Sequence, residues 1–358
     1  MWPYWAMFLV PAIVAFVEGG RAPAQRSTAR GMPLEWFAAW VAITLVIGLR
    51  WKTGGDWFNY ADNLDKLQGL TFWEAITSKD PGFAVLSWIT LEMDWGVVGV
   101  NMMIAPLFAL ALVRFCSSLP RPWLALAIAI PYLVVVVAMG YSRQGVALAC
   151  GMLGLLALSR RSPRAFLGWV LLGATFHKTA VLLLPIAMLV QQGNRILTGV
   201  YAVAITAGAY FLLLADSVDD LYENYVLAEY QSEGALIRLL MNAVPALVFL
   251  RYSKRMGLSP TQASLWRWFA WISILLLAIL FATNASTAVD RVGLYMLPLQ
   301  LVVFSRLPEV LGHRSREVQI WAGIVILYYA VVLFTWLNFA AHSQYWMPYR
   351  FYPLELAP

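Results

Sequence analysis

The sequence predicts an all-α integral membrane protein, a single bundle of about 12 transmembrane helices that occupies residues 1–358. Its composition is the first reason, because 61% of the residues are hydrophobic and only 12% are charged, whereas soluble domains carry about 25% charged residues. The second reason is a series of apolar runs near the length of a membrane-spanning helix. The third is that basic residues collect in alternate connections between these runs.

The apolar runs define the expected helices. The first run lacks the basic start and the cleavage pattern of a secretory signal, so we expect it to remain as the first span. Three runs between residues 144 and 192 are short, and we expect polar residues to continue them into a cavity lined by protein. In chain order the runs are 3–18, 33–50, 96–115, 122–139, 144–158, 165–177, 179–192, 196–214, 236–250, 267–282, 291–305 and 318–337.

The basic residues predict the orientation of the bundle. Sixteen of the 25 Lys and Arg lie beside alternate connections, and short loops rich in Lys and Arg stay in the cytoplasm. Both termini and the segments 51–95, 215–235 and 338–358 are therefore expected outside. The stretch 81–95 is too short to span, and we expect a re-entrant or interfacial helix there.

The same composition argues against several classes of function. The net charge of +6 comes from short loops between apolar runs, so it does not indicate nucleic-acid binding. Cys116 and Cys150 are expected in the cytoplasmic halves of helices, which supports neither a disulfide nor an outer thiol nucleophile. The sequence has neither a cluster of His and Cys residues nor an Asp-x-Asp motif, so it does not indicate a metal site.

Ionisable residues that the topology does not explain are expected to gather at the outer face, where Lys and Arg are normally scarce. A cationic cavity that also carries carboxylates, in an otherwise apolar protein, predicts a functional site. These residues are Asp56, Asp80, Arg143, His177, Lys178, Asp290, Arg291 and Arg350.

Asp56 and His177 are candidates for moving a proton, and Asp80 is a further candidate for the site. Asp56 lies beside the end of a span, where desolvation raises the pKa of a carboxyl toward the range of a useful base. Asp80 precedes a Pro-Gly pair in the same outer segment. His177 lies at the tip of an outer hairpin and titrates near neutral pH when unperturbed. The competing interpretation is structural, with the two Asp residues as helix caps and His177 as a packing residue.

The basic candidates suit an anionic ligand. Arg143 lies in a very short outer connection, and its planar guanidinium matches a phosphate or a pyrophosphate. Arg291 and Arg350 would complete a clamp for a dianionic group, with Lys178 in support. The alternatives are that Arg143 and Lys178 anchor the protein at the interface, and that the Asp290-Arg291 pair only caps a helix.

The C-terminal segment is rich in aromatic residues. Tyr345, Trp346 and Tyr349 have rings that would stack on sugars. Rings of this kind also form the belts that lie at the surfaces of a bilayer. The sequence leaves both interpretations open.

Six short motifs, in this order, resemble a known family. They are Gly55-Asp56-x3-Tyr60, Asp80-Pro81-Gly82-Phe83, Arg143-Gln144, Phe176-His177-x-Thr179-Ala180, Asp290-Arg291 and Pro348-Tyr349. The series resembles the EpsG family of Wzy-like exopolysaccharide polymerases of bacterial inner membranes, and it spans residues 51 to 350. Asp80 replaces an expected Glu, and Thr179 stands where Ser is common.

The resemblance implies a polymerase with a GT-C-like architecture. Donor and acceptor would be oligosaccharide repeat units linked to undecaprenyl diphosphate, joined at the periplasmic face by inverting transfer without a metal or other cofactor. Membrane lipid and a chain-length regulator protein are the other implied partners, and nucleic acid is not.

The resemblance also assigns roles to individual residues. Arg143 and Arg291 would hold the pyrophosphate with support from Lys178 and Arg350, and either Asp56 or His177 would be the base. The remaining residues expected to line the substrate site are Tyr60, Asp80, Gln144, Asp290 and Tyr349. The alternatives are a glycan ligase, a transferase that uses a polyprenyl-phosphate sugar, and a flippase of lipid-linked oligosaccharide. A transporter is disfavoured because the unusual charges are expected at one face and not at mid-depth.

Overall fold

The computed structural model describes residues 1–19, 31–77, 80–190, 234–283 and 286–355. Within these residues the secondary structure is helical, apart from a single isolated β-bridge between Arg50 and Phe351. The expected all-α class is therefore confirmed. The expected span at 196–214 and most of the outer segment 215–235 lie outside the described residues.

The helices follow the predicted apolar runs closely. The helices that lie in these runs include α1 (Trp2–Glu18), α2 (Leu34–Gly48), α6 (Gly96–Ser117), α7 (Pro122–Ala129) with the π-helix η1 (Ile130–Ala138), α8 (Ser142–Ser159), α9 (Pro163–Phe176), α10 (Leu184–Val190), α13 (Ala235–Tyr252), α14 (Pro260–Ala282) and α18 (Ser315–Phe339). The other described elements are α3 (Trp57–Leu67), α4 (Phe72–Ile76), α5 (Pro81–Glu92), η2 (Lys178–Leu183), η5 (Ser253–Arg255), α15 (Ser286–Gly293), η6 (Leu294–Met296), α16 (Pro298–Phe304), α17 (Leu307–Leu311), η7 (Ser343–Tyr345) and α19 (Tyr352–Glu355).

Five described helices are long and apolar enough to cross a membrane: α6, α8, α13 with η5, α14 and α18. A sixth candidate is the broken span formed by α15–η6 and α16–α17, which bend by 44° at the break. Shorter apolar helices cover 2–18, 34–48 and 122–138. The chain is therefore a multi-pass membrane protein by length and composition, and the count of about 12 spans stays a prediction.

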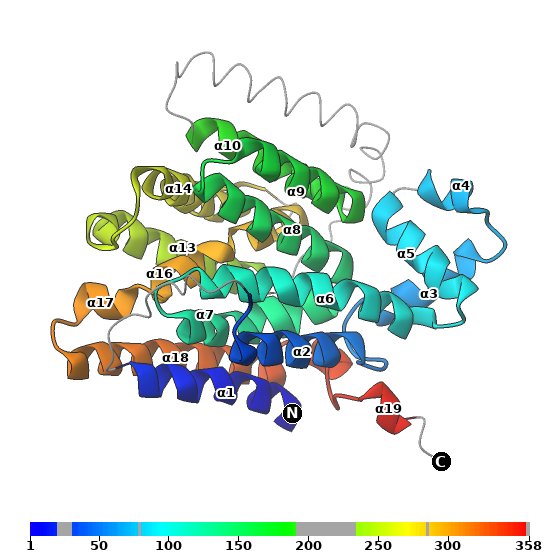
Figure 1. The fold of residues 1–358 in the computed structure, drawn as a ribbon, viewed down its shortest axis with the longest axis horizontal. Coiled ribbons are helices and arrows are strands. Elements are labelled where there is room, and N and C mark those ends of the chain that lie inside the picture. Colours follow the sequence, from blue (N-terminus) through cyan, green and yellow to red (C-terminus); the bar gives the residue numbers. More distant parts are fainter. Residues whose placement is uncertain (20–30, 78–79, 191–233, 284–285, 356–358) are drawn as a thin grey trace.

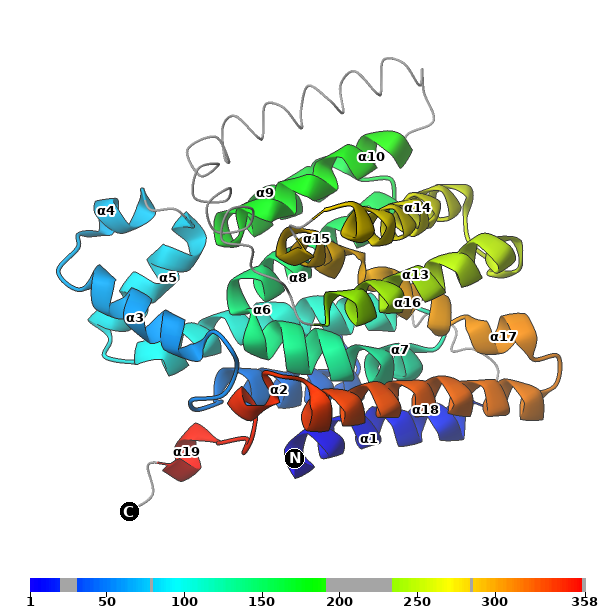
Figure 2. The ribbon, with the colours of Figure 1, turned by 180° about the vertical axis from the view of Figure 1, so that it is seen from behind.

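The long helices lie roughly parallel, and α8 lies at their centre (Figures 1 and 2). One row runs from α2 through α6 and α8 to α9, and each helix packs on the next. A second group joins α1, α7 and α18 along one side. On the other side α13 packs on α14 and on α16. Residues 130–138 are all buried, so the π-helix lies in the core of the bundle.

The connections with basic residues and the outer segments lie at opposite ends of the bundle. Helix α17 and the start of α18 lie at the left end in Figure 1, and α3, α4, α5 and α19 lie at the right end. At the basic end, Arg121 forms a salt bridge with Glu309 and donates a hydrogen bond to the carbonyl oxygen of Glu18. This arrangement is the one that the alternation of basic loops predicts.

Helices α3 to α5 form a cap at the other end of the bundle. Helix α5 is the helix expected within 81–95, and it packs on α4, α6 and α9. Gly82 allows the close approach to α9, because a Cβ at this position would lie 2.4 Å from the hydroxyl oxygen of Thr175. The Asp-Pro-Gly sequence thus begins a helix and also holds that beginning against the end of α9.

Candidate functional site

Arg143 connects the first turn of α8 to the α3–α5 cap. Its Nη1 donates to Oδ2 of Asp80 at 2.9 Å, and its guanidinium lies 5.9 Å from the ring centroid of Tyr60 and 5.7 Å from that of Phe83. The Arg143 side chain is 37% exposed, whereas that of Asp80 is 16% exposed. The guanidinium is thus held on one side by a carboxylate and two rings, and it remains partly open on the other.

Asp56 lies in the turn before α3, and the Tyr60 hydroxyl lies between its carboxylate and the backbone N–H of Arg143. Its Oδ2 accepts a hydrogen bond from the hydroxyl of Tyr60 at 3.3 Å, and its backbone N–H donates to the carbonyl oxygen of Gly140 at 3.3 Å. The turn requires Gly54, which has a φ of +108° and whose Cβ would lie 2.0 Å from the carbonyl oxygen of Met139. Asp56 is therefore fixed against the connection that leads into α8.

The two titratable groups of this turn have shifted pKa values. Burial raises the pKa of Asp56 above its ordinary value, although the charges of Arg291 and Arg143 oppose the shift. Burial, followed by the charge of Asp56, raises the pKa of Tyr60 to about 12. Tyr60 is therefore a hydrogen-bond donor at neutral pH, and Asp56 is a carboxyl that ionises less readily than an exposed one.

Arg291 belongs to the broken span and contacts residues at the start of α8. It lies in α15, and its guanidinium stacks 3.9 Å from the ring centroid of Tyr141. Its Nη1 donates to Oε1 of Gln144 at 3.4 Å, while Nε2 of Gln144 donates to the carbonyl oxygen of Arg291 at 2.6 Å. These two contacts join α15 to the first turn of α8, where Arg143 also lies.

His177 lies in the turn between α9 and η2. Its Nδ1 accepts a hydrogen bond from the backbone N–H of Thr179 at 3.4 Å, and it lies 3.0 Å from the hydroxyl of Thr179. That hydroxyl lies 3.1 Å from the hydroxyl of the buried Tyr295. Burial and the charges of Arg143 and Arg291 lower the pKa of His177 to about 3, so the imidazole is neutral at neutral pH.

The two arginines thus act on the same groups although they come from distant parts of the sequence. The charges of Arg143 and Arg291 both act on the carboxylate of Asp56 and on the imidazole of His177. The geometry that accompanies these effects is local: Arg291 contacts Tyr141 and Gln144 at the start of α8, and the Tyr60 hydroxyl lies between the Arg143 backbone N–H and the Asp56 carboxylate. Guanidinium groups suit an anion with more than one charge, and the binding of one substrate by these residues stays a prediction.

Two other expected site residues, Asp290 and Tyr349, make contacts with other helices. Asp290 forms a bidentate pair with Arg238 of α13, at 2.7 and 2.9 Å, and both side chains are largely buried. The hydroxyl of Tyr349 donates to the carbonyl oxygen of Val46, and its ring packs edge-on against Tyr4. Asp290 and Tyr349 therefore connect neighbouring elements of the bundle, and their roles toward the substrate stay predictions.

Lys178 and Arg350 lie in segments that adjoin His177 and the turn before α3, respectively. Lys178 begins η2, immediately after His177, and its side chain is half-buried. Arg350 is exposed, and its backbone carbonyl oxygen accepts a hydrogen bond from the N–H of Trp51. Their supporting roles toward a substrate stay predictions.

The interpretation of Trp346 as a sugar-stacking residue is wrong. Its side chain is only 1% exposed, and its Nε1 donates to the carbonyl oxygen of Val135 in the π-helix at 2.7 Å. A Cβ added to Gly140 would lie 2.5 Å from its ring. Trp346 therefore packs against the connection between η1 and α8, which leads to Arg143.

Arg50 is a structural residue that the sequence analysis did not identify. It is 1% exposed, and its guanidinium donates to the carbonyl oxygens of Ile47 and Thr53, to Oδ1 of Asn101 and to the hydroxyl of Ser142. These contacts join α2, the outer turn, α6 and α8 immediately behind Arg143. The only sequence signal was a cation at the end of an apolar run, which is equally typical of an interface anchor.

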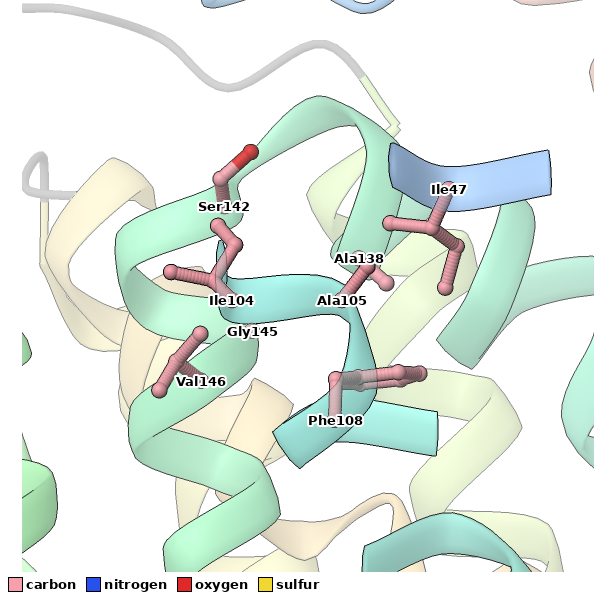
Figure 3. Close-up of a pocket in the computed structure, with 8 residues that line it drawn as sticks. All are labelled: Ile47, Ile104, Ala105, Phe108, Ala138, Ser142, Gly145 and Val146. Carbon is pink, nitrogen blue, oxygen red and sulfur yellow. The ribbon is translucent and has the colours of Figure 1, made fainter. Parts of the chain in front are cut away.

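A small apolar gap lies beside Ser142, between α2, α6 and the start of α8 (Figure 3). It is too narrow for a water molecule, and its lining is apolar apart from Ser142. The lining residues are Ile47, Ile104, Ala105, Phe108, Ala138, Ser142, Gly145 and Val146. The gap is therefore a packing feature of the helix junction and not a substrate cavity.

Fold and site together define a multi-pass membrane protein with a cationic site at the end of the bundle opposite its basic loops. A family model described as the EpsG family matches residues 35–351, which is nearly the whole chain. The chain belongs to the EpsG family, whose members are Wzy-like polymerases. No curated protein and no solved structure matches the chain.

Proposed function

We propose that this protein is a Wzy-like polysaccharide polymerase that joins oligosaccharide repeat units carried on a lipid diphosphate, at the periplasmic face of a bacterial inner membrane. The family membership supports a polymerase in general. The observation that carries the specific proposal is that Arg143 and Arg291 both lie at the start of α8, where Arg291 contacts Tyr141 and Gln144 and the Tyr60 hydroxyl links the Arg143 backbone to the Asp56 carboxylate. A glycosyl diphosphate needs this combination, because its leaving group is an anion and its acceptor is a hydroxyl.

The proposed reaction transfers a glycosyl group from the lipid diphosphate of the donor to a hydroxyl of the acceptor. The oxygen of the acceptor hydroxyl forms a bond to the anomeric carbon of the donor, and the bond from that carbon to the diphosphate oxygen breaks. The diphosphate leaves with the bonding electrons, and Arg143 and Arg291 stabilise its added charge. The hydroxyl proton passes to Asp56 or His177. Attack from the face opposite the leaving group inverts the configuration.

The arginine pair takes the electrostatic role that a metal ion has in other transferases. Each guanidinium offers planar N–H donors to phosphate oxygens. The contacts of Arg143 to Asp80 and of Arg291 to Gln144 keep the two side chains oriented before the substrate arrives. An oriented charge does not have to reorganise during the reaction, and this is how fixed charges lower a barrier.

The experiment that tests the proposal uses purified protein and a defined repeat unit on undecaprenyl diphosphate. Wild-type protein should give a ladder of products that differ by whole repeats, whereas a ligase or a single-sugar transferase would give one product. Arg143→Ala and Arg291→Ala should each lower the rate of extension by about 100-fold or more. Lys66→Ala, at an exposed position of α3 outside the site, is the matched control and should leave the ladder unchanged.

Ladders of normal length in both arginine variants would remove the diphosphate clamp from the model. A wild-type protein that carries the lipid-linked unit across a vesicle membrane without extending it would instead establish a transporter. Both experiments need the variants to accumulate in the membrane at the wild-type level, which is measured on the same preparations.

A further inference from the structure

The arrangement around His177 distinguishes between the two candidates for the base, and the argument rests on the proposed function. Two groups of Thr179 contact the same ring nitrogen, Nδ1. A backbone N–H can only donate, so Nδ1 must offer its lone pair to it and cannot carry a proton. In a neutral imidazole the proton is then on Nε2.

The hydroxyl of Thr179 strengthens this assignment. It lies 3.0 Å from Nδ1 and 3.1 Å from the hydroxyl of Tyr295. A consistent set of donors runs from the Tyr295 hydroxyl to the Thr179 hydroxyl and from there to Nδ1, which again leaves the proton on Nε2. Tyr295 is 1% exposed, so bulk water does not compete for its hydroxyl.

We propose that His177 acts on the substrate as a hydrogen-bond donor through Nε2–H, and that Asp56 is the group that accepts the proton of the attacking hydroxyl. With its lone pair directed at Thr179, the ring presents to other groups only an N–H, which cannot take up a proton. The carboxylate of Asp56 accepts hydrogen bonds from the side chains of Tyr60 and Asn59, and its remaining lone pairs can accept the hydrogen bond of a substrate hydroxyl.

The charges around the two residues agree with this division of roles. Arg143 and Arg291 act on both groups. A proton on His177 would add a third positive charge beside two guanidinium groups, whereas a proton on Asp56 removes a charge from a buried carboxylate. The Nε2–H group would bind an oxygen of the diphosphate or of a sugar.

Two amide substitutions at position 177 test the roles of Nδ1 and Nε2 separately. In His177→Gln the amide nitrogen takes approximately the place of Nε2, so the donor is kept and the contact to Thr179 is lost. In His177→Asn the amide oxygen takes approximately the place of Nδ1, so the contact to Thr179 is kept and the donor is lost. Neither amide can act as a base.

The ladder assay should find His177→Gln within about 10-fold of the wild-type rate, with His177→Asn and His177→Ala lower by about 100-fold or more. Equal and high activity of the Gln and Asn variants would show that His177 only shapes the turn. Loss of activity in all three would return His177 to the role of base. Either result would overturn the proposal.

A spectroscopic measurement tests the tautomer without any turnover. The chain has three histidines, so protein labelled with ¹⁵N in histidine gives few signals, and His177→Gln identifies those of His177. At neutral pH, Nδ1 should resonate as an unprotonated nitrogen and Nε2 as a protonated one. The reverse pattern, or an imidazolium, would overturn the tautomer, whereas a wild-type protein without polymerase activity would contradict the proposed function and leave this measurement intact.

Discussion

At the scale of single residues, Asp56 shows how a site can reduce the stability of its own fold. Burial raises its pKa, and the charges of Arg291 and Arg143 only partly oppose this effect. A group whose folded-state pKa is raised stabilises the fold in its protonated form. That contribution is fully present below the unfolded-state pKa and is lost as the pH rises through the folded-state value. Above the folded-state pKa the ionised carboxylate therefore costs folding free energy relative to an exposed one.

The Asp56→Asn variant tests this cost, because asparagine stays neutral at every pH. We expect the variant to lose extension activity by about 100-fold or more, because an amide cannot accept the proton. Its thermal midpoint at pH 7 should equal or exceed that of the wild type. A variant that is both inactive and clearly less stable would indicate that the carboxylate holds the turn together and is not a base.

The same shift predicts how extension depends on pH in the wild type. A base must be ionised, so the rate should fall as the pH decreases through the pKa of Asp56, which lies above that of an exposed Asp. The fall should persist in His177→Gln, because glutamine does not titrate. A fall that disappears in His177→Gln would assign the acidic limb of the profile to His177 instead.

At the scale of elements, the C-terminal segment supports the first outer turn. The N–H of Trp51 donates to the carbonyl oxygen of Arg350, the N–H of Tyr352 donates to that of Leu49, and the N–H of Gly54 donates to that of Tyr345. Trp346 adds a side chain that reaches the π-helix. Contacts with residues far away in the sequence thus hold the turn that carries Asp56 in place.

The Trp346→Phe variant removes the indole N–H and keeps an aromatic ring. The carbonyl oxygen of Val135 then loses a buried donor, which costs about 1–3 kcal/mol of folding free energy. We expect a lower thermal midpoint together with slower extension, since the turn beneath Asp56 loses its support. Tyr345→Phe is the matched control, because Tyr345 is 41% exposed and its loss of a hydroxyl should leave the midpoint unchanged. Equal midpoints in the two variants would contradict the role of Trp346 as an anchor.

These contacts also show which features the sequence predicts and which it does not. The helices were predictable because apolar runs and basic loops are local patterns, and a bilayer imposes both. The core position of Trp346 was not predictable, because an aromatic residue in a terminal segment has the same local pattern in a core as in an interfacial belt. Its partner Val135 lies 211 positions away.

The same contrast between local patterns and long-range contacts applies to the residues of the candidate site. Asp56, Arg143, His177 and Arg291 could be chosen as candidates because charged residues near span ends at an outer face are unusual, and their roles stay predictions. The pair between Asp290 and Arg238, and the burial of Arg50, depend on which helices are neighbours. No local pattern carries that information.

At the scale of the whole molecule, the two ends of the bundle differ in chemistry. One end has the basic connections and the contacts of Arg121, and the other has the charged site beneath the α3–α5 cap. Loops rich in Lys and Arg stay in the cytoplasm, so the site should face the periplasm. This orientation is required if the substrate is a finished repeat unit on the outer leaflet.

Single cysteines at the two ends test the orientation. Cys116 and Cys150 are both buried, so the native chain should react little with a thiol reagent. Lys66→Cys places a thiol at an exposed position of α3, and Ser315→Cys places one at the exposed start of α18. In cells with a permeabilised outer membrane, a membrane-impermeant maleimide should label Lys66→Cys and should label Ser315→Cys only after the inner membrane is broken. The opposite pattern would place the arginine pair in the cytoplasm, where lipid-linked repeat units on the outer leaflet cannot reach it, and the polymerase proposed above would then have no access to its substrate.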